Sequence, residues 1–122
     1  MKITSFDPMI LTAHPEETVA LFEALGFERR HTKREFGVYK TTFIRMGLGE
    51  FRVNIVDAPP LEQDRVYVHI NVDDFQEGYD FLISKGFRSA IGDELSSDAS
   101  SVGTSLISPS GFTITLGQHI RK

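Results

Sequence analysis

The chain has 122 residues, of which 40% are apolar, with no cysteine and a net charge of −4. This length can bury one hydrophobic core, and the lack of cysteine excludes disulfides and thiolate metal sites. Nucleic-acid binding needs a clustered basic surface, whereas the lysines and arginines here are scattered. No apolar run long enough to span a membrane and no signal-like leader is present, so we expect a cytoplasmic, single-domain protein with neither a nucleic-acid nor a membrane partner.

The first half of the chain predicts the order strand, helix, strand, strand, strand. The helix is expected over residues 14–26, because Pro15 suits a first helical turn, Gly26 suits a helix end, and the apolar residues between them recur at helical spacing. A tight turn is expected at 47–49. The strands are expected over residues 6–13, 27–33, 38–46 and 50–57.

The second half repeats this order about sixty residues later. Asp73 or Asp74 is expected to cap its helix, and Gly86 to end that helix as Gly26 ends the first. The segment 58–65 is expected to be a linker, and the polar segment 92–100 either a flap over a pocket or an ordinary surface connection. The strands are expected over residues 66–72, 87–91, 101–108 and 112–118. Neither half can bury its sheet and helix alone, so the two halves must pair.

Several short motifs are spread along the whole chain. The helices close in ALGF (24–27) and SKGF (84–87), VHINVDD (68–74) joins a strand to a helix cap, and SPSGFTITL (108–116) is a turn and strand. Together they resemble the vicinal oxygen chelate superfamily, which includes glyoxalase I, extradiol dioxygenases, and fosfomycin- and bleomycin-resistance proteins. The resemblance implies an α+β fold, a single domain in which two paired βαβββ modules (1–60 and 61–122) form a curved, cup-shaped mixed sheet. It also implies helices on the outside and a ligand in the cup.

Strand alternation predicts which side chains face away from the helices. In the strand from 66, the alternate residues Val66, Val68, Ile70 and Val72 form an apolar row suited to packing under a helix. The same reasoning, extended to the first strand by the sixty-residue offset, assigns these residues to the inner face: Asp7, Met9, Leu11, Arg52, Asn54, Val56, Tyr67, His69, Asn71, Thr113 and Thr115. Phe43 and Arg45 share one strand face, but alternation leaves open whether that face is the inner one.

Metal-dependent members of the superfamily carry His, Gln or Glu at four equivalent strand positions. Carried over, these positions correspond here to Asp7, Asn54, Tyr67 and Thr115, of which only Asp7 is a strong ligand for a divalent metal. We therefore expect no metal and no other cofactor. His69 leaves an alternative open, because a register shift of one residue pair could bring it into a metal site with Asp7 and Asn54.

No phosphate-binding glycine loop and no nucleophile elbow occurs in the sequence, so we assign no catalytic residue. The leading hypothesis is metal-independent binding of a small molecule, of which an antibiotic is one candidate; the net charge suits a neutral or cationic ligand. The expected ligand-binding residues are Asp7, Met9, Phe43, Asn54, Tyr67, His69 and Thr115.

Two alternatives stay open: a metal-dependent lyase or dioxygenase with an atypical ligand set, and a non-catalytic structural or regulatory domain. The resemblance also implies a homodimer, in which the modules pair either within one chain or between two chains.

Overall fold

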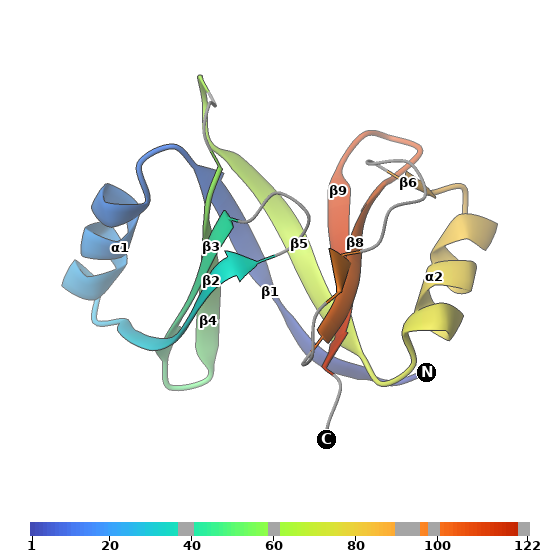
Figure 1. The fold of residues 1–122 in the computed structure, drawn as a ribbon, viewed down its shortest axis with the longest axis horizontal. Helices are drawn as coiled ribbons and strands as arrows, with labels where there is room; N and C mark the ends of the chain where they lie inside the picture. The colour runs from blue at the N-terminus through green and yellow to red at the C-terminus, as the bar shows by residue number, and fades with distance from the viewer. Residues whose placement is uncertain (37–40, 59–61, 90–95, 98–100, 120–122) are drawn as a thin grey trace. The chain divides into compact units, whose positions relative to one another are not determined.

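The computed structural model describes residues 1–36, 41–58, 62–89, 96–97 and 101–119, which form an α+β fold as expected (Figure 1). Two compact units are present: the first unit is Asp7–Val66, and the second unit is Met1–Phe6 together with Tyr67–Lys122. That these units make up a single domain with modules 1–60 and 61–122 stays a prediction. No helix in the described ranges is long and apolar enough to cross a membrane.

The first unit has the predicted strand, helix and three strands. In its mixed sheet the order is β2-β3-β4-β1; β1 runs parallel to β4, whereas β4, β3 and β2 are antiparallel neighbours. Its helix lies on one side of the strands (Figure 1). The elements are β1 (Ile3–Thr12), α1 (Pro15–Ala24), β2 (Glu28–Phe36), β3 (Thr41–Leu48) and β4 (Phe51–Asp57).

The second unit repeats this topology, which confirms the internal repeat. Here β5 runs parallel to β9, and β9, β8 and β6 are antiparallel neighbours. The elements are β5 (Arg65–Val72), α2 (Phe75–Ser84), β6 (Arg88–Ser89), β7 (Ser96–Ser97), β8 (Ser101–Ile107) and β9 (Thr113–His119).

Strand β7 was not predicted, because it falls in the polar segment 92–100. Its two serines pair with Gly103 and Val102 of β8. Backbone pairing with a neighbouring strand creates this element, and a run of serines carries no alternating pattern that would predict it. The rest of the proposed flap lies outside the described residues.

Both helices end in the same hydrogen-bonded motif. The N–H of Phe27 donates to the carbonyl of Phe22 at 2.9 Å and the N–H of Gly26 to that of Glu23 at 3.0 Å, which is the Schellman pattern. The phenylalanine rings of the first motif also touch edge to face, 5.3 Å apart. Gly86 and Phe87 repeat the pattern at the end of α2. The glycines have φ of 104° and 94°, a left-handed conformation that other residues adopt at a cost.

The turn between β3 and β4 lies later than the expected 47–49. Leu48 pairs with Phe51, so that Gly49 and Glu50 form the turn, with Gly49 at φ 59°. Gly47 belongs instead to β3, where the side chain of Arg30 lies against it: a Cβ on Gly47 would come within 2.4 Å of the guanidinium carbon. The close approach of this side chain explains why a glycine stands inside a strand.

Each unit has its apolar core between its helix and its sheet. In the first unit Ile44, Met46, Val53 and Ile55 are buried together with Val19 of α1. In the second unit the buried cluster consists of Val72, Phe75, Leu106 and Leu116. Alternation was therefore predicted correctly in the middle of β4, β5 and β9, whereas Val66, the first residue of the row predicted in β5, is exposed and does not pack under the helix. The core also shows which side chains of β3 face the helix. Because Ile44 and Met46 face α1, Phe43 and Arg45 face the opposite side.

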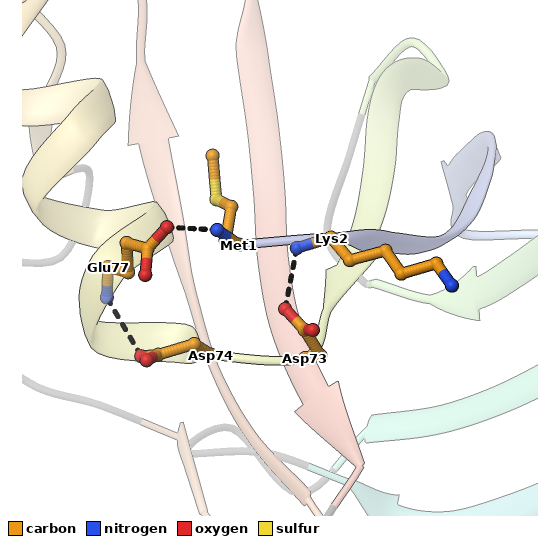
Figure 2. A network of polar contacts seen from close by, with 5 residues as sticks. All are labelled: Met1, Lys2, Asp73, Asp74 and Glu77. Atoms are coloured by element: carbon orange, nitrogen blue, oxygen red, sulfur yellow. Dashed lines mark hydrogen bonds and ion pairs between the residues drawn. The ribbon is translucent and has the colours of Figure 1, made fainter.

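The start of α2 is held by polar contacts to the beginning of the chain (Figure 2). Asp74 is the N-cap and accepts a hydrogen bond from the N–H of Glu77 at 3.0 Å, whereas Asp73 accepts one from the N–H of Lys2 at 2.6 Å. Glu77 pairs with the Met1 amine, and this hydrogen bond is the main cause that raises the pKa of the amine above 8.0. Of the two candidate caps, Asp74 caps the helix, whereas Asp73 binds the backbone of Lys2 just before β1.

Candidate functional site

Strand register gathers predicted site residues on the helix-free face of the first unit. Asn54 of β4 is the Cα partner of Met9 in β1 and of Arg45 in β3. Cross-strand partners present their side chains on the same face of a sheet. Asp7 lies two residues before Met9, and Phe43 two before Arg45, so alternation brings both to this face. We call this set the polar face of the first unit: Asp7, Met9, Phe43, Arg45 and Asn54.

Asn54 is the centre of this face. Its side chain is 0% exposed, and its amide nitrogen donates to Oδ1 of Asp7 and, at 3.3 Å, to the carbonyl of Pro8. The amide oxygen accepts a hydrogen bond from Nε of Arg45 at 3.1 Å. One amide group therefore bridges a carboxylate and a guanidinium, with its nitrogen towards the negative group and its oxygen towards the positive one.

Asp7 is buried with half of its hydrogen-bonding capacity unused. The residue is 4% exposed, and its Oδ2 has no hydrogen-bond partner among the described residues. Leaving a buried polar atom unsatisfied costs about 1–3 kcal/mol, and more for a charged group. An oxygen in this state is an acceptor for a hydrogen-bond donor brought by another molecule.

Arg45 supplies the positive charge of the face. Its side chain is half-buried, and burial is the main cause that lowers the pKa of its guanidinium, while Asp7 acts in the opposite direction. The guanidinium carbon lies 6.0 Å from the centre of the Phe43 ring. Arg45 was absent from the predicted site residues, although Phe43 on the same strand face was among them. The sequence signal that could have identified Arg45 is its two-residue spacing from Phe43, because residues two apart in a strand share a face. The register of β3 with β4 shows that this is the face of Asn54.

The equivalent face of the second unit is polar but differs in chemistry. His69 and Thr115 are Cα partners, as Met9 and Asn54 are in the first unit, and Nδ1 of His69 lies 2.6 Å from Oγ1 of Thr115. Tyr67, at the position equivalent to Asp7, is half-buried. The Asn71 amide donates to the hydroxyl of Ser5 at 2.9 Å. The three predicted site residues Tyr67, His69 and Thr115 thus lie on one face, and none of the three carries a carboxylate.

The donor atoms on these faces do not suit a divalent metal. No group of three or more His, Cys, Asp or Glu that could hold a metal ion occurs within the described ranges. In the first unit, one oxygen of Asp7 is bonded to Asn54, and the amide oxygen of Asn54 is bonded to a guanidinium. A divalent cation coordinated by these oxygens would lie beside the positive charge of Arg45, which is unfavourable.

Comparison with known proteins identifies the fold but not a close relative. No family model and no curated protein matches the chain. Among solved structures, methylmalonyl-CoA epimerase from Mycobacterium tuberculosis is similar with a TM-score of 0.73 and 13% identity, covering 98% of this chain and 90% of that one.

Two further structures are similar over comparable lengths. A glyoxalase/bleomycin resistance protein/dioxygenase superfamily member from Vibrio splendidus has a TM-score of 0.61 and 14% identity, covering 98% of this chain and all 100% of its own. A Streptomyces coelicolor methylmalonyl-CoA epimerase in complex with 2-nitronate-propionyl-CoA has a TM-score of 0.68 and 17% identity, with coverage of 98% and 100%. These likenesses confirm the predicted resemblance to the vicinal oxygen chelate superfamily at the level of the fold.

Proposed function

We propose that this protein binds a small molecule on the polar face of the first unit, without a metal and without changing the molecule chemically. The observation that carries the proposal is Oδ2 of Asp7, a buried acceptor for which no described residue provides a donor. A selective site needs a few placed polar groups in apolar surroundings, and Met9 and Phe43 provide such surroundings. A structural neighbour in complex with a coenzyme A derivative shows that this fold can hold a small ligand.

Metal independence is supported by what the candidate ligands already do. Asp7 and Asn54 bond each other, Asn54 also bonds Arg45, and His69 bonds Thr115. A metal bound by Oδ1 of Asp7 or by the amide oxygen of Asn54 would break these contacts, and a metal bound by Oδ2 of Asp7 would add positive charge near the guanidinium of Arg45. We therefore derive no reaction step through a metal, and the alternative of a metal-dependent lyase or dioxygenase is the less favoured proposal.

The residues Tyr67, His69 and Thr115 form a separate candidate binding face, on the second unit. The short contact between His69 and Thr115 fixes the imidazole orientation, which is useful for recognising a hydrogen-bonding ligand. Their part in binding is testable separately, because His69→Phe removes the polar ring atoms while keeping an aromatic side chain. Loss of ligand binding in this variant would support a binding role for the face of the second unit, and unchanged binding would leave the first unit as the only proposed site.

Thermal unfolding in the presence of a chemically diverse panel of metabolites and antibiotics tests the main proposal. A ligand at about 100 times its Kd stabilises the native state by about 2.7 kcal/mol, which raises the Tm by several degrees. We expect at least one compound to stabilise the wild type and not Asp7→Asn. The matched control is Asp64→Asn, which removes an exposed carboxylate and should respond as the wild type does.

Two results would overturn the proposal: no compound stabilises the wild type, or every stabilising compound acts equally on Asp7→Asn. Metal dependence is tested on the same compounds, after treatment with a chelator and after addition of nickel, zinc, manganese or iron. Binding should persist in the chelated protein, and each compound should be recovered unchanged. Binding or turnover that needs an added metal would favour the enzymatic alternative.

A homodimer is a further proposal, supported only by the resemblance to the superfamily. Closed two-fold dimers are the commonest form of soluble oligomers. Analytical ultracentrifugation of the purified chain tests the proposal directly. A sedimenting species of twice the chain mass of 13.7 kDa is expected, and a monomer at all concentrations would contradict it.

A further inference from the structure

We infer that the ligand of the polar face is dipolar, with a protonated amine that binds Asp7 and a carboxylate that binds Arg45. The inference rests on the proposed function, and it deepens that function by naming the chemical class of the ligand. It follows from three features of the first unit: an unused acceptor, unused donors, and a single amide that separates them.

The unused acceptor is Oδ2 of Asp7. Oδ1 accepts a hydrogen bond from Asn54, and this bond holds the carboxylate in one orientation. Asp7 as a residue is 4% exposed, and its Oδ2 atom is buried. A charge-assisted hydrogen bond from an ammonium group would satisfy it and is about twice as strong as a neutral one.

The unused donors are the two Nη groups of Arg45. Its Nε is committed to Asn54, and no described residue accepts a hydrogen bond from either Nη. The side chain is half-buried, and its position near the Phe43 ring limits how far the guanidinium can move. A planar guanidinium with free N–H groups is well suited to binding a carboxylate.

Asn54 keeps these two charges apart. Its amide accepts a hydrogen bond from the guanidinium of Arg45 and donates one to the carboxylate of Asp7, so the amide lies between the two charged groups. The two strands that carry them flank β4 on opposite sides, which makes the spacing rigid. A single small molecule with charges at its two ends can therefore meet both groups.

The two groups together favour a dipolar ligand over a singly charged one. Asp7 acts electrostatically on Arg45, and so does Arg52, which lies two residues before Asn54 in β4 and carries a second positive charge. A simple cation bound to Asp7 would add positive charge beside two arginines. A simple anion bound to Arg45 would leave Oδ2 of Asp7 without a donor among the described residues. A dipolar molecule supplies a donor to Asp7 and an acceptor to Arg45 without adding net charge to a partly buried site.

Three probes with the same apolar body test the inference: phenylalanine, phenethylamine and 3-phenylpropanoate. They carry both charges, the amine alone and the carboxylate alone. Isothermal titration calorimetry of the wild type should give the lowest Kd for phenylalanine, with about a 10- to 100-fold loss for either singly charged probe, as expected for a charge-assisted hydrogen bond. This comparison needs no variant and so does not depend on one that folds.

Variants then assign each end of the probe. Asp7→Asn should weaken the binding of phenylalanine and of phenethylamine. Arg45→Met should weaken the binding of phenylalanine and of 3-phenylpropanoate. Arg45→Lys keeps the charge but loses the planar fork and should fall between Arg45→Met and the wild type. Circular dichroism verifies that each variant is folded.

The inference is wrong if phenylalanine does not bind, or if phenethylamine binds as tightly as phenylalanine. Those outcomes leave the proposed function standing as long as the wider panel contains a compound whose binding depends on Asp7. If the wider panel also contains none, the proposed function itself fails.

Discussion

Replacing Asn54 with leucine should destabilise the protein strongly, although leucine is similar in size and more apolar. Asn54 is fully buried and bridges Asp7 and Arg45. Leucine would remove the donor to the carboxylate and the acceptor for the guanidinium. Asp7 would then have both oxygens without a described partner, in a place where water has little access.

The expected loss follows from the two hydrogen bonds. A hydrogen bond to a charged group contributes about 1.5–3 kcal/mol, so two contribute about 3–6 kcal/mol. Burying the apolar surface of leucine returns about 1.5–3 kcal/mol, so the middle of the two ranges leaves a net loss of about 2 kcal/mol out of a typical total stability of about 5–15 kcal/mol. The equivalent change in the second unit, Thr115→Val, removes one hydroxyl contact with His69. That loss should be only about 0.5–1.5 kcal/mol.

Urea unfolding followed by circular dichroism measures both variants under the same conditions. The free energy of unfolding should fall more in Asn54→Leu than in Thr115→Val, with similar m-values. A changed m-value would indicate that one unit unfolds separately, and fluorescence or proteolysis would then locate the loss to the first unit. An Asn54→Leu variant as stable as Thr115→Val would refute the view that Asn54 satisfies two charged groups.

Three further predictions concern the ends of the two helices and the start of the chain. Gly26→Ala should cost about 1–2 kcal/mol because of its left-handed φ of 104°. Gly86→Ala should lower the free energy of unfolding more, since its Cβ would come within 3.0 Å of a proline ring carbon, whereas the nearest atom to a Cβ at Gly26 lies 3.7 Å away. Equal decreases in Tm for the two variants would contradict this. Asp74→Ala should remove the cap of α2 and lower the free energy of unfolding by about 1 kcal/mol in urea titrations, whereas an unchanged midpoint would exclude a capping role. The Met1 amine has a raised pKa in the folded state, so its pairing with Glu77 stabilises the fold fully below about pH 8 and is lost as the pH rises through the folded pKa. Stability measured from pH 7 to 10 should fall less steeply in Glu77→Gln, and identical slopes would contradict the pairing.

Local sequence signals were enough to predict the repeat and most of the elements. Each helix ends at a glycine followed by phenylalanine, because only glycine adopts the left-handed conformation easily and the phenylalanine returns to the core. Alternation correctly separated Ile55 from Asn54 and Ile70 from His69. These patterns depend on neighbours in the chain, so they can be read without knowing the tertiary structure.

Features that depend on pairing between distant strands could not be predicted in this way. Strand β7 exists because β8 lies beside it, and the turn at Gly49 is set by the pairing of Leu48 with Phe51. Both are decided by backbone hydrogen bonds to residues whose positions are not encoded in a local pattern.

The candidate site shows the same division. The sequence by itself assigned Asp7, Met9 and Asn54 to one face, from period-two alternation in the strand of Asn54 and from the sixty-residue offset in the strand of Asp7 and Met9. Only the tertiary structure joined Arg45 to them, since the register of β3 against β4 determines which of its two faces meets Asn54. The tertiary structure also decided that one oxygen of Asp7 is bonded and the other is not. Hydrogen-bond satisfaction depends on distances between side chains from three strands, and no one-dimensional pattern contains those distances.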